Sequence, residues 1–216
     1  MIGSSRSAPP STPGCTGAPG AAKAGCLAKL DRRLADVNVL GSRVAGAQHI
    51  TAAHTTALHA KLDSTTSGLT ALRATIVADT DRPTTVADCL KQATDYRVYA
   101  LLAPQVHLVR ALDLEAFAAT KVDGVTARIQ HAIDTAAGAG KDVTAARASL
   151  ADATAKVTDA TTKATGLADA VLAITPASFN ADHSALGNTR STAGAIRADL
   201  AAIRADLATI RQSLRH

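Results

Sequence analysis

The C-terminal end of the chain repeats a seven-residue pattern, and this repeat constrains the fold more than any other feature of the sequence. The word AIRADLA stands twice in succession, at 195–201 and 202–208. Two positions of the repeat form an apolar seam, made by Leu186, Ala193, Leu200, Leu207 and Leu214 at one position and by Thr189, Ile196, Ile203 and Ile210 at the other. A seven-residue period is slightly shorter than two turns of α-helix, so such helices supercoil around a partner. We therefore expect a long helix that packs along another helix.

A second strict heptad precedes the first and supplies that partner. After the helix break GAGK at 138–141, which Asp142 can follow as a cap, one core position holds Val143, Leu150, Val157, Ala164 and Val171, and the other holds Ala146, Ala153, Ala160, Leu167 and Ile174. Thr175 and Pro176 begin a turn before the last helix. Residues 138–216 are thus predicted to form an antiparallel coiled-coil helix pair that packs on the preceding helices.

Composition favours thin helix pairs over a thick globular core. Hydrophobic residues make up 47% of the 216 residues, but many are alanine, there is no Trp, and the aromatic residues are Tyr96, Tyr99, Phe117 and Phe179. An alanine buries far less apolar area than a leucine or phenylalanine, but it allows two helices to approach closely. The predicted fold is all-α, an elongated antiparallel helical bundle or coiled coil of long, alanine-rich helices.

Residues 21–137 are predicted to form helical hairpins. A first apolar stripe of Leu27, Leu30, Leu34, Val37 and Val44 is followed by a chain reversal at 45–51, where Thr51 is placed as a helix cap. A second stripe comprises Leu58, Leu62, Leu69, Leu72 and Ile76, and a third helix, with Pro83 in its first turn, carries Val86, Leu90 and Ala93. Residues 96–103 could form a short strand, but we prefer a helix kinked at Pro104 that continues to Ile133.

The first twenty residues are rich in Pro, Gly and Ser and are predicted to be a disordered leader. They contain no apolar segment of a signal peptide, and no stretch of the chain is apolar enough to span a membrane. Two alternatives remain open, a cytoplasmic protein with an unstructured tail or an exported protein whose true start lies upstream.

No sequence motif predicts catalysis, a cofactor or a metal. GAGK lacks the first glycine and the Ser or Thr of a phosphate-binding loop, because Thr135 and Asp142 stand there. His49, His54 and His59 are spaced five apart, which turns them to different helix faces. We therefore predict a non-enzymatic protein with no small-molecule substrate.

Cys26 and Cys89 are candidates for a disulfide. If the chain reverses at 45–51, both cysteines lie at the same end of the helices, within reach of a bond. Two separate buried thiols are an equally good interpretation. Cys15 falls in the leader.

Four arginines of the last helix form a stripe beside its seam, Arg190, Arg197, Arg204 and Arg211, and Asp199 and Asp206 flank its other side. Charges at these heptad positions select a partner and its orientation. The stripe could dock another protein or a second copy of the chain, but we favour a seam within the chain.

The words GLTALRATIVADTD, DYRVYALLAPQVHLV and GKDVTAARASLADATAKV resemble a group of uncharacterised actinobacterial helical coiled-coil proteins. Members of the group are usually exported and carry one Cys early and another before the DYRVY segment, where Cys26 and Cys89 stand here. The resemblance implies an exported coiled-coil protein but no activity.

We therefore favour a structural or protein-interaction module that is secreted or in the cell envelope. The alternative is an amphipathic helical protein that binds anionic membrane surfaces, since arginines lie beside an apolar face. Nucleic-acid binding is disfavoured, because it is suggested only by the net charge of +5, and acids interrupt every basic stretch.

Overall fold

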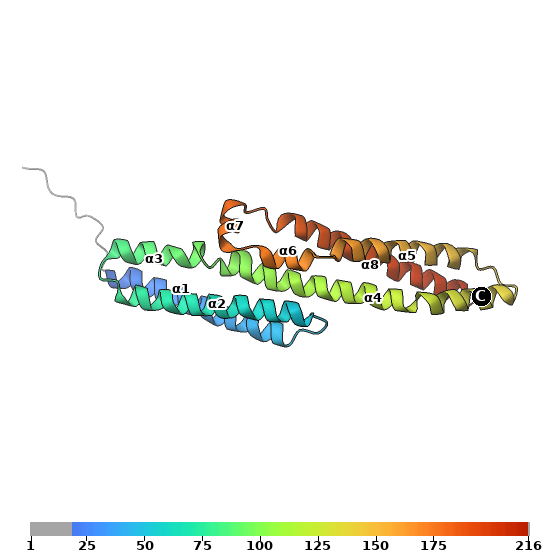
Figure 1. The fold of residues 1–216 in the computed structure, drawn as a ribbon, viewed down its shortest axis with the longest axis horizontal. Helices are drawn as coiled ribbons and strands as arrows, with labels where there is room; N and C mark the ends of the chain where they lie inside the picture. The colour runs from blue at the N-terminus through green and yellow to red at the C-terminus, as the bar shows by residue number, and fades with distance from the viewer. Residues whose placement is uncertain (1–18, 216) are drawn as a thin grey trace, which may run out of the picture.

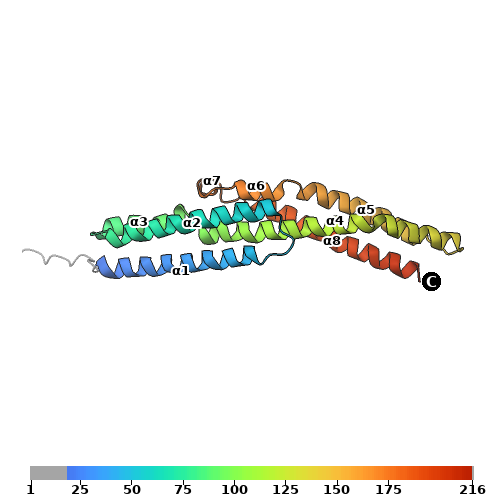
Figure 2. The same ribbon diagram turned by 60° about the horizontal axis from the view of Figure 1, so that its bottom comes forward.

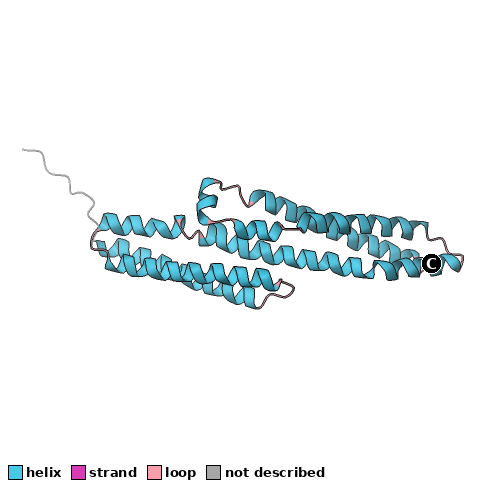
Figure 3. Cartoon of the chain, in the orientation of Figure 1, coloured by secondary structure: helices cyan, strands magenta, loops and turns pink. Residues whose placement is uncertain are grey.

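The computed structural model describes residues 19–215, which are helical apart from short connections and include no strand (Figures 1 and 3). The prediction of an all-α fold is confirmed for this part of the chain. The elements are α1 (Pro19–Ala45), α2 (Ala52–Ala78), α3 (Arg82–Thr94), the π-helix η1 (Val98–Leu102), α4 (Ala103–Gly138), α5 (Thr144–Ala164), α6 (Leu167–Ala173), α7 (Pro176–Ala181) and α8 (Gly187–Ser213). Of the predicted leader, residues 1–18 lie outside the described residues, and Pro19 and Gly20 belong to α1.

The long helices follow a common direction, and α4 connects the two ends of the molecule (Figures 1 and 2). Helices α1, α2 and α3 pack together at one end, whereas α4, α5 and α8 pack together at the other. The short helices α6 and α7 lie beside the first part of α4 and the end of α3. No helix among residues 19–215 is long and apolar enough to cross a membrane.

The hairpin of α1 and α2 forms as the sequence predicts. The chain reverses between Ala45 and Ala52, and the Thr51 hydroxyl accepts a hydrogen bond from the His54 N–H as an N-cap. All five apolar residues of the predicted α2 stripe are buried: Leu58, Leu62, Leu69, Leu72 and Ile76. On α1, Leu30, Val37 and Val44 are buried, and Leu27 and Leu34 are partly buried.

Helix α3 is turned the opposite way from the prediction. Val86 and Leu90, which were placed in the core, are 45% and 62% exposed, and Ala93 is exposed too. Its buried residues are instead polar: Thr85, Asp88 and Gln92. The reason lies in specific bonds, because the Gln92 amide oxygen accepts from Arg33 of α1 at 2.6 Å and Gln92 donates to the sulfurs of Cys26 and Cys89.

The helix that was expected to continue through a kink at Pro104 is interrupted before the proline, at residues 95–97. Helix α3 ends at Thr94, and Arg97 adopts a left-handed conformation with φ of 45°. From Val98 the chain winds as a π-helix into α4, with the Leu102 N–H donating to the Arg97 carbonyl at 3.2 Å. A proline cannot donate an N–H and crowds the preceding turn. The wider π-turn just before Pro104 accommodates it, and residues 98–103 are helical, so the alternative of a short strand is wrong.

The helix predicted to run from 143 to 174 is interrupted. It ends as α5 at Ala164, and Gly166 takes a left-handed conformation, with φ of 69°, before α6 begins. Glycine adopts this conformation without steric cost. The expected turn at Thr175 and Pro176 is a short helix, α7, whose capping box joins Thr175 and Ser178.

Helices α5 and α8 form the most extensive helix–helix contact in the described chain. At one heptad position of the predicted α8 seam, all four residues are buried: Thr189, Ile196, Ile203 and Ile210. At the other position, Leu200, Leu207 and Leu214 are partly buried. Facing them on α5 are the buried Ala146, Leu150, Ala153, Val157 and Ala160. The faces that the two heptads predict to be buried are therefore the faces along which α5 and α8 meet.

Candidate functional site

The aspartates beside the α8 seam bond within the chain. Asp206 accepts from Lys156 of α5 at 3.0 Å, and Asp199 accepts from Lys163 of α5 at 2.9 Å. These pairs fix the antiparallel register of α5 and α8. They favour the interpretation of a seam within the chain over a docking stripe for the acidic side of α8.

The arginine stripe, in contrast, is divided among different surroundings. Arg197 donates from Nε to Glu115 Oε1 of α4 at 2.6 Å, and Arg190 lies near it along the same groove. Arg204 is exposed, and Arg211 borders an apolar hollow formed with α4. Only Arg190 and Arg197 of the predicted stripe therefore share a site.

That site is a basic groove between α1, the start of α4 and α8. Two adjoining hollows, of about 430 and 240 Å³, share Tyr99, Ala103 and His107. One extends to Arg190 and Arg197 on α8, and the other extends to α1. The α1 residues that line the groove are Asp36, Val39, Leu40 and Arg43.

Apolar side chains line much of this basic groove. Tyr99 and Val39 are each 49% exposed, which is unusual for large apolar residues in the part of the chain that the structure describes. The Tyr99 hydroxyl donates to Asp36 Oδ2 at 2.6 Å, and the Arg33 guanidinium lies 5.2 Å from the ring centre. Both contacts hold the aromatic ring in place while one part of it stays open to solvent.

Positive charge dominates the electrostatics of the basic groove. The pKa of His107 is lowered by burial and by the nearby guanidiniums of Arg43 and Arg110, so its imidazole is neutral at pH 7. The Arg110 Nε is buried without a hydrogen-bond partner in the described structure. Burial raises the pKa of Glu115, against the opposing effect of Arg197. An anionic ligand would therefore meet more positive than negative charge here.

Several residues of the basic groove could not be predicted from the sequence pattern. Tyr99 and His107 lie within the DYRVYALLAPQVHLV segment, but no local pattern indicated that Arg43 of α1 would lie beside them. The only sequence signal was the arginine spacing on α8. The groove arises from tertiary packing of segments that are far apart in the chain.

Cys26 and Cys89 are brought together and form a disulfide, with Cα atoms 5.8 Å apart. Of the two interpretations left open by the sequence, the structure has the bonded pair. Cys15 lies outside the described residues.

The histidines around the α1–α2 turn stabilise tertiary contacts. His54 Nδ1 lies 2.7 Å from Asp113 Oδ1 of α4, and its Nε2 lies 3.2 Å from Asp169 of α6. Asp113 also accepts from the Thr51 N–H at 2.8 Å, and the ring of His49 stacks on Phe117 at 3.8 Å. Within residues 19–215, no cluster of three His, Cys, Asp or Glu side chains is placed to hold a metal ion.

The contacts of His54 predict that the free energy of unfolding depends on pH. Burial of the ring lowers the pKa of His54, but hydrogen bonds and charge from Asp113 and Asp169 outweigh it, so the pKa is raised overall. A raised folded-state pKa stabilises the fold below the unfolded pKa of about 6.5. This contribution is lost as the pH rises through the folded-state pKa. For a chain of this length, about 1 kcal/mol of stability corresponds to about 2–4 °C in Tm, which thermal unfolding resolves.

The test is thermal unfolding of the protein and of His54→Gln at pH 5.5 and pH 8.5. We expect His54→Gln to lower Tm more at pH 5.5 than at pH 8.5, because only the protonated imidazole forms an ion pair with Asp113. His59→Gln, on the same helix, serves as the control and should lower Tm equally at the two values. An equal loss at both pH values for His54→Gln would show that the ion pair contributes nothing.

No protein-family model, no curated protein and no solved structure matches the chain.

Proposed function

We propose that this chain is a non-enzymatic, elongated coiled-coil module that binds an acidic segment of another protein in its basic groove. The observation that carries the proposal is the positive charge of a groove that is also lined by apolar side chains, among them Tyr99 and Val39. Among the described residues, no carboxylate forms an ion pair with Arg43 or Arg190, which lie at opposite sides of the groove. Arginine guanidiniums suit carboxylates because they donate two parallel hydrogen bonds.

The shape of the site favours a peptide segment over a membrane surface. The cationic and apolar groups line two adjoining hollows that share Tyr99, Ala103 and His107, an arrangement that suits an extended chain. The exposed parts of Tyr99 and Val39 offer contact for an apolar side chain of the segment. The proposed partner is thus an acidic segment that also carries a large apolar residue.

We further propose that the protein acts outside the cytoplasm. A disulfide between Cys26 and Cys89 persists in oxidising compartments and is rare in the reducing cytoplasm. The resemblance to usually exported actinobacterial helical proteins implies the same location, which stays a prediction.

A binding experiment with matched arginine variants tests the proposed partner. The probe is a fluorescent random copolymer of Glu and Tyr, and the comparison probe is a vesicle containing anionic phosphatidylglycerol. We expect Arg43→Gln/Arg190→Gln to weaken copolymer binding by about tenfold or more, because each charge-assisted contact contributes about 1.5–3 kcal/mol. The control Arg204→Gln/Arg211→Gln removes the same charge outside the groove and should change binding little.

Two outcomes would contradict the proposal. Equal weakening in both double variants would mean that net charge alone attracts the copolymer. Vesicle binding without copolymer binding would favour the alternative, an amphipathic protein of anionic membrane surfaces.

A further inference from the structure

An apolar hollow lies between α4 and α8, near the end of the molecule that carries the C-terminus. It has a volume of about 580 Å³, within the range of small-molecule sites. Two successive turns of each helix line it: Val125, Arg128, Ile129 and Ala132 from α4, and Leu207, Ile210, Arg211 and Leu214 from α8. The last turns of α8 separate from α4 in this region (Figure 2). We name this feature the α4–α8 hollow.

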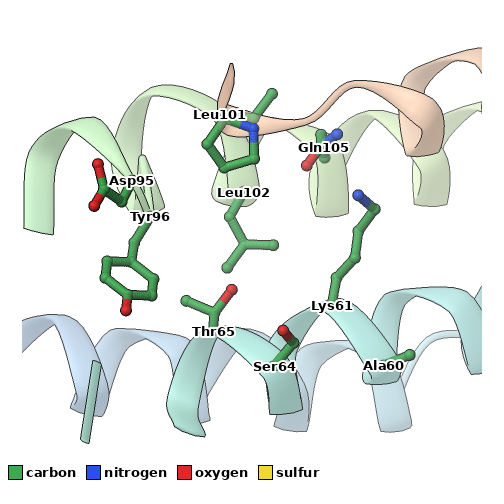
Figure 4. A pocket seen from close by; sticks show the side chains of 10 residues that line it. Ala60, Lys61, Ser64, Thr65, Asp95, Tyr96, Leu101, Leu102 and Gln105 are labelled. Atoms are coloured by element: carbon green, nitrogen blue, oxygen red, sulfur yellow. The ribbon is translucent and has the colours of Figure 1, made fainter. Parts of the chain in front are cut away.

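The lining of the α4–α8 hollow is apolar apart from its two arginines. The hollow between α2 and the start of α4 is different, because Lys61, Ser64 and Thr65 bring polar groups to it (Figure 4). The residues that line the α4–α8 hollow offer neither a hydroxyl nor an amide side chain to a ligand. A ligand there would therefore gain most of its contact from apolar surface.

The floor of the α4–α8 hollow is part of the core. Ile210 is 3% exposed and packs in one cluster with the buried Ile133 and Leu150. The last turn of α8 is attached to the turn between α4 and α5, because Lys141 donates to the Leu214 carbonyl at 3.1 Å. The hollow is thus formed before a ligand binds, so little ordering of the protein opposes binding.

The two arginines of the lining are cations without a carboxylate partner. Arg128 and Arg211 are exposed, and neither forms an ion pair with a carboxylate of residues 19–215. The aspartates of the same helix segments, Asp134 of α4 and Asp206 of α8, accept from basic side chains of α5 instead. Each free guanidinium can donate two parallel hydrogen bonds to an anionic headgroup.

We propose that the α4–α8 hollow binds a fatty acid of medium chain length, with its carboxylate at Arg128 and Arg211 and its acyl chain on the apolar floor. The lining extends from position i to i+7 on both helices, which is about 10.5 Å along a helix axis, so a chain of moderate length fits. Charge argues against a second copy of the protein as the occupant. Two such hollows placed face to face would bring four arginines together, and like charges in contact oppose association.

Calorimetry and NMR chemical-shift changes on the full chain test this site. The probes are hexanoate, octanoate and decanoate below their micelle-forming concentrations, and octanol and octyltrimethylammonium are the neutral and cationic comparisons. We expect saturable binding that strengthens about tenfold for every two added methylenes, because each methylene removes further apolar area from water. Octanol should bind about tenfold more weakly than octanoate, and octyltrimethylammonium more weakly still, because neither can accept from the arginines.

A charge variant tests the arginines. Arg128→Gln/Arg211→Gln should weaken decanoate binding about tenfold or more and should remove the preference for octanoate over octanol. The control Arg32→Gln/Arg204→Gln removes the same charge at exposed positions outside the hollow and should change neither quantity. Because the preference is a ratio between two probes on one protein, a partial loss of folded protein does not produce it.

A steric variant tests the apolar floor. Ala132→Phe places a large side chain in the hollow at an exposed position, so it should weaken octanoate and octanol alike, by about tenfold. The matched control is Ala127→Phe, at an exposed alanine of α4 that does not line the hollow, and it should leave both affinities unchanged.

Three results would overturn the proposal: no saturable binding of monomeric decanoate, equal binding of octanoate and octanol, or equal effects of a variant and its matched control. Binding of phosphatidylglycerol vesicles without binding of monomeric decanoate would also overturn it, since the arginines would then serve a membrane surface. The site goes beyond the proposed function, and its test is separate. Arg43 and Arg190 lie outside the α4–α8 hollow, so a failure of copolymer binding at the basic groove does not alter the result expected here.

Discussion

Ile203→Asp is expected to lower the free energy of unfolding by about 3–5 kcal/mol. Ile203 is fully buried and packs in a cluster with Ala153 and Val157 of α5. A carboxylate placed there would lose its hydration and gain no cation, because Lys156 and Lys163 already pair with Asp206 and Asp199. Denaturant unfolding followed by circular dichroism measures the loss.

The matched control is Ala205→Asp, which introduces the same group at an exposed position of α8. It should change the free energy of unfolding by less than about 0.5 kcal/mol. Ala202, which the heptad register places outward, is partly buried and is therefore a poorer control. Similar losses in Ile203→Asp and Ala205→Asp would mean that the α5–α8 seam is not where the structure has it.

Regular patterns on long helices were predictable from the sequence. The α8 seam and the α2 stripe were found because apolar residues repeat with the helical period, and Thr51 was found because a hydroxyl caps the following N–H groups. These signals are local. They depend only on one helix and its nearest partner, so they can be recognised in the sequence without knowledge of the tertiary structure.

The misplaced features depend on contacts between distant segments. Val86 and Leu90 on α3 have a helical spacing, but the inner face of α3 is set by the disulfide and by the bonds of Gln92. Gly166 interrupts an otherwise unbroken heptad because its backbone takes a left-handed turn, which apolar spacing does not reveal. The residues that line the basic groove with Arg190 were not predictable from the sequence, since the groove joins α1, α4 and α8.

Helix α3 is expected to depend on its disulfide more than an ordinary helix would. Its inward residues Thr85, Asp88 and Gln92 are polar, so burying them contributes little hydrophobic stabilisation. Its larger apolar residues, Val86 and Leu90, face solvent. The bond from Cys26 to Cys89, which are 63 residues apart, therefore replaces part of the apolar contact that normally holds a helix in place.

Cys26→Ser/Cys89→Ser should accordingly lower the free energy of unfolding by about 2–4 kcal/mol, since a long covalent loop no longer restricts the unfolded chain. The loss should be uneven. Hydrogen exchange should accelerate most in residues 82–94 and least at the α5–α8 seam, because α3 loses its main attachment while the seam keeps its apolar contacts. Cys15→Ser is the control, since it leaves the bonded pair intact, and it should change neither stability nor exchange.

The same bond connects the fold to the compartment in which the protein acts. Peptide mapping of protein isolated from its native source, with free thiols blocked first and no reductant present, should recover Cys26 and Cys89 in one disulfide-linked peptide pair. That result would place the chain in an oxidising compartment, because a reducing cytoplasm keeps such thiols reduced. Recovery of both as blocked thiols would remove the argument for export. It would also predict that α3, with its polar inner face, already exchanges rapidly in the native protein, which the hydrogen-exchange experiment measures independently.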